Sequence, residues 1–354
     1  MSEPDTPDDP DIADTQDRAL GALSGLALGD ALGMPTQSMS RELIAARYGP
    51  ITTLLDGAPD QPIAPGHPAG SITDDTEQAL LLAQLLIDGA GRVEPMMFAE
   101  ALELWEEDMV RRGSADLLGP STKRAIERLR AGESPERAGR DGTTNGAAMR
   151  IAPVGIAVPA TDPPGLLDLV VQASRVTHNT GLGLAAAAAV AAAVSAGVGG
   201  ADLPDALDEA ERAAEAGGRL GHWTAGGSIA ARIRWARRWV RGMSRARLAD
   251  AVADVIGTSV ASQESVVAAF ALAEGLGADP AEALRTAAGL GGDTDTMAAI
   301  CGAILGARHG AAGLPADLLE RVRQVNSLDL APVVDGLLKL RTTHHSGGRH
   351  GHQH

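Results

Sequence analysis

The chain of 354 residues has only one cysteine, Cys301. A single cysteine cannot form a disulfide within the chain, and it cannot supply the paired thiolates of a Cys-based zinc site. Disulfides belong mainly to oxidising compartments. We therefore expect a cytoplasmic protein.

Basic residues are also scarce relative to acidic ones. Lys and Arg number 30 against 46 Asp and Glu, which gives a formal net charge of −16. Phosphate contacts need clustered Lys and Arg, so nucleic-acid and membrane-surface partners are not expected, whereas metal cations are compatible with this charge. Aromatic residues make up 2% of the chain and hydrophobic residues 44%. A core built mainly from Ala, Leu, Val and Ile implies closely packed helices with small side chains at their contacts.

The composition of neither end of the chain is typical of a hydrophobic core. Residues 1–18 carry seven acidic residues and one basic residue, whereas a secretory signal needs a basic start and an apolar run. Residues 1–17 are predicted to be a disordered acidic tail. Residues 342–354, which hold five of the nine histidines, are predicted to be a disordered His-rich tail.

Between these ends, the pattern is helical. Phe98, Leu102, Trp105 and Met109 show the three- and four-residue spacing of an amphipathic helix, and no run alternates as a strand does. We expect one all-α domain over residues 18–341. The Ala-rich segment 181–198 is of marginal length for a membrane span and is read as a buried central helix. In residues 232–247 we expect Trp235 and Trp239 to pack inward and the arginines to be solvated, and contact with an acidic partner or another subunit is the alternative.

Two short acidic segments carry the strongest functional signal. Residues 71–76 (SITDDT) and 291–296 (GGDTDT) each place two Asp and at least two Thr just before an apolar helix. Carboxylate and hydroxyl oxygens are the ligands that Mg²⁺ and Mn²⁺ prefer. Helix capping is the alternative, because Thr and Asp are favoured at helix starts. Two clusters with more carboxylates than capping needs favour a metal site.

Three other segments leave their roles open. Asp30, in residues 29–33 (GDALG), is either a further carboxylate beside the metal ligands or part of a helix end that stops at Gly33. The Gly-rich residues 142–150 (GTTNGAAMR) allow backbone N–H groups to approach a phosphate or ribose, but a plain turn has the same composition. A lone histidine such as His178 is more often a capping or core residue than a ligand.

Taken in order, these segments resemble the ADP-ribosylglycohydrolase family, which includes the dinitrogenase reductase-activating glycohydrolase and the ADP-ribosyl-acceptor hydrolases. The resemblance extends from about Ala19 to Leu314. The matching segments are residues 29–33 (GDALG), 73–76 (TDDT), 145–150 (NGAAMR), Thr177 with His178, and 291–296 (GGDTDT).

The resemblance implies a compact multi-helix bundle with a central cleft that holds two divalent cations, Mg²⁺ or Mn²⁺. The implied metal ligands are Thr73, Asp74, Asp75, Asp293, Asp295 and Thr296. Asp116 would be the catalytic base, with Asp75 and Asp295 as metal-bound alternatives. The substrate side of the cleft would be formed by Asn145, Gly146, Ala147 and His178.

The chain departs from the family pattern at two places. Gln37, which would lie on the substrate side of the cleft, stands near the position where many relatives have a functional Glu, and Gln can act neither as a base nor as a charged ligand. The segment after His178 lacks the proline that relatives often have there. The implied reaction is hydrolysis at C1 of a ribosyl group. The substrate is then an ADP-ribosylated protein or small molecule, or a smaller riboside. A non-catalytic protein on the same fold is the remaining alternative.

Overall fold

The structure is a computed structural model that describes residues 10–112, 114 and 118–347. These residues form eighteen α-helices and no β-strand, and the strand-like pairings among them are isolated bridges such as Met39 with Gly292. The all-α prediction is confirmed.

The helices run as follows. They are α1 (Pro10–Gly33), α2 (Arg41–Tyr48), α3 (Asp74–Asp88), α4 (Pro95–Arg111), α5 (Pro120–Arg130), α6 (Pro135–Ala138), α7 (Gly146–Met149), α8 (Ala152–Ala157), α9 (Pro163–His178), α10 (Gly181–Val198), α11 (Leu203–Gly217), α12 (Ile229–Val240), α13 (Arg245–Ala251), α14 (Ser265–Leu276), α15 (Pro280–Ala287), α16 (Thr294–His309), α17 (Ala316–Asn326) and α18 (Ala331–Gly347). Short 3-10 helices are η1 (Met34–Thr36) and η3 (Ala311–Gly313), and η2 (Val252–Ile256) is a π-helical turn.

Glycines allow α1 and α16 to pack backbone against backbone. Four glycines spaced four residues apart line one face of α1, because residues i and i+4 share a helix face. A Cβ added at Gly25 would lie 2.1 Å from the carbonyl oxygen of Gly302, and one at Gly33 would lie 2.3 Å from the Cα of Asp295. The last turn of α1 therefore lies directly against the first turn of α16.

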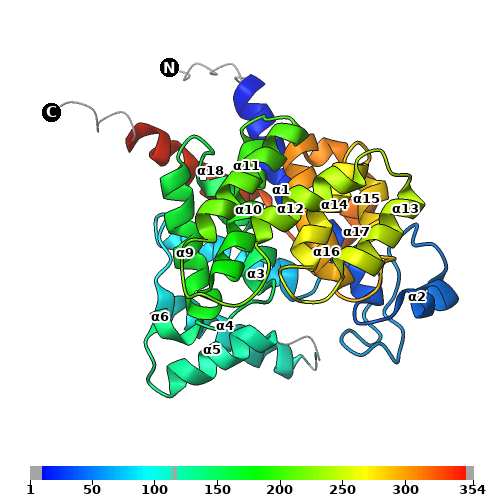
Figure 1. Ribbon diagram of the computed structural model, residues 1–354, viewed down its shortest axis with the longest axis horizontal. Coiled ribbons are helices and arrows are strands. Elements are labelled where there is room, and N and C mark those ends of the chain that lie inside the picture. Colours follow the sequence, from blue (N-terminus) through cyan, green and yellow to red (C-terminus); the bar gives the residue numbers. More distant parts are fainter. Residues whose placement is uncertain (1–9, 113, 115–117, 348–354) are drawn as a thin grey trace, which may run out of the picture.

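The Ala-rich helix α10 is the second core element. Every residue from Leu182 to Val198 is buried, and 94% of the stretch that is apolar enough to cross a membrane is covered by the rest of the protein. Figure 1 shows α10 in green among α9, α11 and α12. The prediction of a buried central helix is confirmed.

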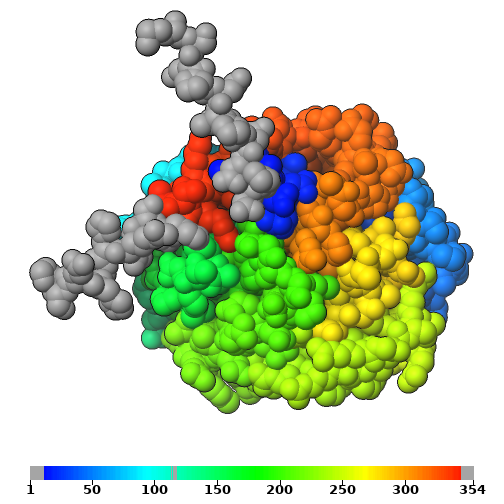
Figure 2. Space-filling model, turned by 90° about the horizontal axis from the view of Figure 1, so that it is seen from above, coloured from blue at the N-terminus to red at the C-terminus, as the bar shows by residue number. Residues whose placement is uncertain are grey.

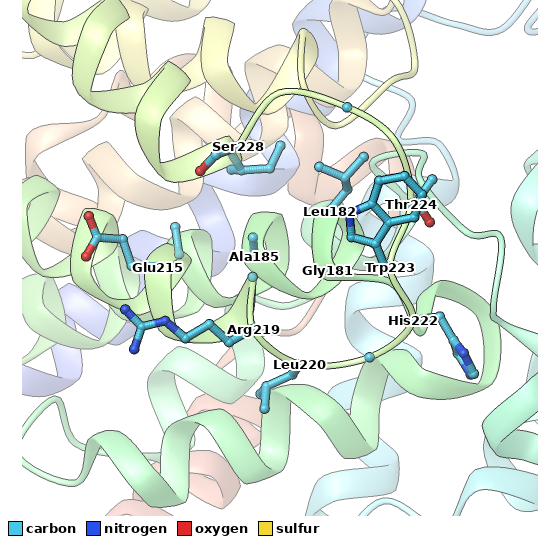
Figure 3. A pocket seen from close by; sticks show the side chains of 15 residues that line it. Gly181, Leu182, Ala185, Glu215, Arg219, Leu220, His222, Trp223, Thr224 and Ser228 are labelled. Carbon is cyan, nitrogen blue, oxygen red and sulfur yellow. The ribbon is translucent and has the colours of Figure 1, made fainter.

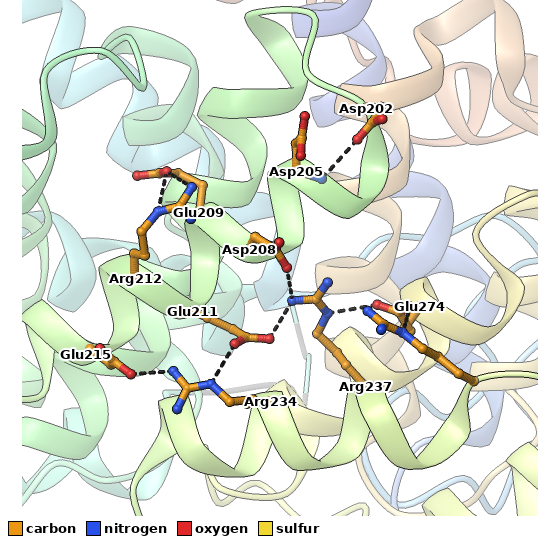
Figure 4. Close-up of polar contacts among 11 residues, drawn as sticks. Asp202, Asp205, Asp208, Glu209, Glu211, Arg212, Glu215, Arg234, Arg237 and Glu274 are labelled. Carbon is orange, nitrogen blue, oxygen red and sulfur yellow. Dashed lines mark hydrogen bonds and ion pairs between the residues drawn. The ribbon is translucent and has the colours of Figure 1, made fainter.

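The expected orientation of α12 is wrong at Arg237 and Trp235, whereas Trp239 is partly buried against the core as expected. Arg237 is buried and donates from Nη1 to Asp208 Oδ1 at 2.9 Å and from Nε to Glu274 Oε2 at 2.8 Å, which joins α11, α12 and α14 (Figure 4). Trp235 is 42% exposed and stacks on Trp239 with ring centroids 5.1 Å apart. Acidic side chains on both neighbouring helices neutralise the buried guanidinium, so the arginine takes the inward position and Trp235 faces outward.

Parts of both predicted tails, residues 10–17 and 342–347, are helical. Helix α1 begins at Pro10, and the Gln16 side chain donates to Asp335 at 2.9 Å. Helix α18 continues to Gly347, and buried Arg341 donates to the carbonyl oxygens of Val158 at 2.9 Å and Ser195 at 3.0 Å. Figure 2 shows the red end of α18 on the same face as the dark-blue start of α1. These tertiary contacts extend both helices into segments that local composition assigned to tails.

Candidate active site

The two acidic segments meet at the N-termini of α3 and α16. Thr73 immediately precedes α3 and Asp293 immediately precedes α16. Across the contact, the hydroxyl of Thr296 donates to Asp75 Oδ2 at 3.1 Å, although the residues are 221 positions apart in sequence. Neither Thr73 nor Asp293 forms a side-chain cap on its helix, so capping does not account for these two positions. We refer to the six residues Thr73, Asp74, Asp75, Asp293, Asp295 and Thr296 as the Asp/Thr cluster.

Asp30 fixes the geometry of the α3 side. Its fully buried carboxylate accepts hydrogen bonds from the backbone N–H of Thr73 at 3.0 Å and of Thr76 at 3.1 Å, and it accepts from both hydroxyls. The position comes from α1, whose glycines bring that helix against α16. The two roles left open for Asp30 are compatible, because α1 ends at Gly33 as expected and the Asp30 carboxylate lies beside the cluster.

The cluster holds an unusual density of buried negative charge. Burial raises the pKa of Asp75 well above its ordinary value of 3.8, and repulsion from neighbouring carboxylates raises it further. These carboxylates, in decreasing order of effect, belong to Asp295, Asp74, Asp30 and Asp293. Burial also raises the pKa of Asp293. Like charges gathered away from water are costly unless a cation or a proton accompanies them.

The donor set fits a hard divalent cation. Among the described residues, Asp75 Oδ1 is buried and has no hydrogen-bond partner. The same part of the chain contains no group of three or more His, Cys, Asp or Glu side chains positioned to hold a metal by themselves. The cluster adds Thr hydroxyls to its carboxylates, and such mixed oxygen donors are those that Mg²⁺ and Mn²⁺ prefer.

The Gly-rich loop reaches the cluster through Asn145. Its Nδ2 donates to Asp293 Oδ2 and to Ser265 Oγ, the latter at 2.9 Å. Gly146 and Ala147 begin α7, and Ala147 is fully buried. Asn145 is thus the member of the predicted substrate set that directly contacts an acidic residue.

His178 lies behind this loop. Its ring is completely buried, and Nε2 shares a hydrogen bond with Thr144 Oγ1 at 2.9 Å. A Cβ added at Gly146 would lie 3.1 Å from Cε1 of the ring, so a larger residue there would require the ring to shift by a few tenths of an ångström. Burial, followed by the charges of Arg150 and Arg124, lowers the pKa of His178 well below 6.5. The neutral ring packs against this loop.

Gln37 borders the α16 side of the site. The segment after η1 pairs with the glycine turn before α16, since Ser38 N donates to Gly292 O at 2.7 Å and Gly292 N donates to Met39 O at 2.9 Å. Gln37 is 6% exposed, and its Nε2 has no hydrogen-bond partner among the described residues. The amide nitrogen is therefore shielded from solvent and lacks an acceptor within the described part of the chain.

Two side chains behind Asp74 were not singled out from the sequence. Gln78 Nε2 donates to Asp74 Oδ2 at 3.1 Å. Arg150 is fully buried, lies 4.9 Å above the Phe98 ring centroid and donates to Thr177 Oγ1 at 2.7 Å. Burial lowers the pKa of Arg150 to about 9, while the charge of Asp74 opposes this shift. Arg150 belongs to the matching segment 145–150, but its position in the sequence does not indicate that its guanidinium lies near Asp74. Asp116, the predicted base, lies outside the described residues.

A cavity of about 470 Å³ opens near the Gly-rich loop. It lies between the start of α10, the end of α11 and residues 218–228, with Leu182 and Trp223 on one side and Arg219 on the other (Figure 3). The rim is tied to the loop, because Thr180 Oγ1 donates to Gly142 O at 2.6 Å. Within the rim, Gly181 N donates to His222 O at 3.0 Å. Trp223 is 87% exposed in a chain with few aromatics.

The fold and the site define an all-helical protein whose acidic centre is assembled from two helix N-termini and a Gly-rich loop. The family model described as ADP-ribosylglycohydrolase matches residues 11–347, and the chain belongs to this family. The protein is therefore an enzyme, a hydrolase of the glycosidase type.

Similar proteins cover nearly the whole chain. The uncharacterised protein YegU of Escherichia coli strain K12 is 34% identical over 328 residues, which are 92% of this chain and 97% of YegU. The ADP-ribosyl-(dinitrogen reductase) glycohydrolase of Rhodospirillum rubrum is 28% identical over 325 residues, 92% of this chain and 96% of that protein. The ADP-ribosylarginine hydrolase Tri1 of Pseudomonas putida strain GB-1 is 28% identical over 91% of this chain and 80% of its own length. A solved structure described as an ADP-ribosylglycohydrolase-related protein complex matches with a TM-score of 0.68 and 28% identity, covering 93% of this chain and 99% of that one.

Proposed function

We propose that the protein removes ADP-ribose from a modified protein or small molecule by hydrolysing the glycosidic bond at C1 of the ribose. The contact between Asp75 and Thr296 carries this proposal, because it joins two acidic helix N-termini into one oxygen-rich centre. The names of the relatives from Rhodospirillum rubrum and Pseudomonas putida point to ADP-ribosylated dinitrogen reductase and ADP-ribosylated arginine as substrates of those proteins.

The Asp/Thr cluster would hold two divalent cations, Mg²⁺ or Mn²⁺. When bound, such ions act as Lewis acids and lower the pKa of water. The chain's own residues prepare the site. Asp30 holds the Thr73 and Thr76 hydroxyls in place, and Asn145 holds the Asp293 carboxylate.

Positive charge develops on the ribose ring as the glycosidic bond breaks. Carboxylates fixed in a buried site stabilise such charge more strongly than water does. Asp116 remains the predicted proton acceptor, with Asp75 or Asp295 as the alternative. The amide of Gln37 would donate a hydrogen bond to the substrate rather than accept a proton.

The cavity beside α10 would receive the nucleotide end of the substrate. An exposed indole at its rim can stack on adenine, since aromatic rings and bases present complementary faces. A smaller riboside would not extend to this position. Trp223→Ala should therefore raise KM for ADP-ribosyl substrates by roughly tenfold, the loss of about 1–3 kcal/mol per stacked base, and leave kinetics on simple ribosides unchanged.

A substrate panel tests the proposal. Purified protein would be assayed on ADP-ribosylated arginine protein, small ADP-ribosyl compounds and simple ribosides, each with Mg²⁺, with Mn²⁺ and in excess chelator. We expect release of ADP-ribose that chelation and Asp293→Ala both abolish. Asp254→Ala, an exposed aspartate on η2, is the matched control and should retain full activity.

Each other outcome of the panel has a defined meaning. Full activity in chelator would remove the metal requirement. Hydrolysis of simple ribosides only would replace the substrate class. No hydrolysis of any substrate with either ion would favour the non-catalytic alternative.

A further inference from the structure

A second cavity, of about 310 Å³, lies between α2, α13 and α15. None of its lining residues belongs to the Asp/Thr cluster. Its walls combine apolar side chains, including Ile44, Ile51 and Leu290, with the arginines Arg41 and Arg285. The volume is within the range of small-molecule sites.

The cavity collects positive charge in a strongly acidic protein. It is lined by one arginine from each of the three helices, Arg41, Arg245 and Arg285, although the whole chain has a net charge of −16. Arg41 pairs with Asp250 at 2.8 Å, and Arg245 pairs more loosely with Glu282 at 3.3 Å. Three guanidinium groups against two carboxylates leave an uncompensated positive charge.

Arg285 supplies that charge. No ion pair or hydrogen bond of its side chain occurs within the described residues, and its Nε is shielded from solvent without an acceptor. Its place in the last turn of α15 suits the helix dipole, which explains a cation there. The dipole does not explain why the shielded N–H lacks a partner.

Thr286 provides an independent sign of a missing ligand. The residue lines the cavity, is 5% exposed, and its Oγ1 is buried without a hydrogen-bond partner in the part of the chain that the structure describes. Buried hydroxyls are normally bonded, so two adjacent orphaned groups beside one cavity are unusual. Both are donors, and an oxyanion would satisfy both.

We propose that this cavity binds a phosphate-bearing small molecule. Arg285 and Thr286 would hold the phosphate, with Arg41 and Arg245 contributing charge from the opposite helices. Planar guanidinium groups match phosphate oxygens in pairs, and several of them favour a dianion over a single carboxylate. The apolar wall of Ile44, Ile51 and Leu290 would contact the organic part of the molecule.

The site is expected to be independent of the catalytic centre. None of the residues that line the cavity belongs to the Asp/Thr cluster. Binding should therefore persist when the cluster is disabled.

Isothermal titration in chelator, with inorganic phosphate, AMP, adenosine and acetate as separate probes, tests the inference. We expect phosphate and AMP to bind, and adenosine and acetate to bind at least roughly tenfold more weakly. Arg285→Gln should weaken phosphate binding by about tenfold or more, the usual effect of losing a charged hydrogen bond. Thr286→Val should weaken it by a smaller factor. Arg247→Gln, an exposed arginine on α13 outside the cavity lining, is the matched control and should bind like the parent.

Four results would overturn the proposal. The first is no phosphate binding up to about 10 mM, the weak end of measurable affinity. The second is equal binding by the parent and Arg285→Gln, with both variants folded by their melting curves. The third is loss of phosphate binding in Asp293→Asn, which would place the ion at the catalytic centre. Equal affinity for acetate would likewise reject phosphate selectivity.

Discussion

Asp30→Asn gives a stability change whose dependence on pH can be worked out from the structure. The carboxylate accepts from two backbone N–H groups and two hydroxyls, and these bonds lower its pKa. Burial outweighs them and raises the pKa from 3.8 to about 6. Asn keeps the shape, loses the charge and supplies one acceptor oxygen instead of two.

Proton linkage determines whether the stability difference grows or shrinks with pH. Folded Asp30 binds its proton more tightly than the unfolded chain does, so its contribution to stability is complete below pH 3.8 and is lost as the pH rises through about 6. Asn does not titrate. At about 1.4 kcal/mol per pKa unit, the advantage of the parent over Asp30→Asn should be roughly 0.8 kcal/mol greater at pH 5.5 than at pH 7.5.

Urea unfolding in excess chelator at these two pH values measures the difference directly. Chelation is needed because a bound cation would hold the cluster ionised. Asp254→Asn, at an exposed position on η2, serves as the control for a change from Asp to Asn. A parent-to-variant difference that stays constant from pH 5.5 to 7.5 would refute the burial argument for Asp30.

Three further variants probe other contacts. Gln37→Glu buries a carboxylate where the present amide nitrogen has no partner, so the Tm of the variant should fall in chelator. Its metal affinity or substrate preference should also change. Melting curves and kinetics equal to those of the parent would place Gln37 outside the site. Arg237→Met removes the cation that pairs with three acidic side chains, and it should lower the free energy of unfolding in urea by about 2–4 kcal/mol. The loss should be smaller than for a fully buried ion pair, because neighbouring arginines still pair with two of these acidic side chains. Gly302→Val places a Cβ 2.0 Å from the Gly25 carbonyl and should cost at least about 3 kcal/mol with loss of activity. Gly119→Ala, with open space around its Cβ, should be neutral, and equal Tm values for both glycine variants would contradict the packing argument.

Local sequence determined the helical class and the residue types of the site. Apolar residues at helical spacing predicted α4, Ala-rich composition predicted the buried α10, and both helices are present. The Thr and Asp residues around positions 73–76 and 293–296 stand at helix starts, where their composition placed them. These features depend on periodicity and on neighbours a few positions apart, so one segment at a time is enough to predict them.

Tertiary structure decided which of these groups meet. Asp30 reaches Thr73 across 43 positions and Thr296 reaches Asp75 across 221, because glycines let α1 lie directly against α16. The inward orientation of the Arg237 side chain likewise depends on acidic side chains from two other helices. The sequence of a helix shows which face carries small or apolar residues, but it does not identify the helix that packs against that face. The partner is chosen by the free energy of packing all the helices together, which no single segment contains.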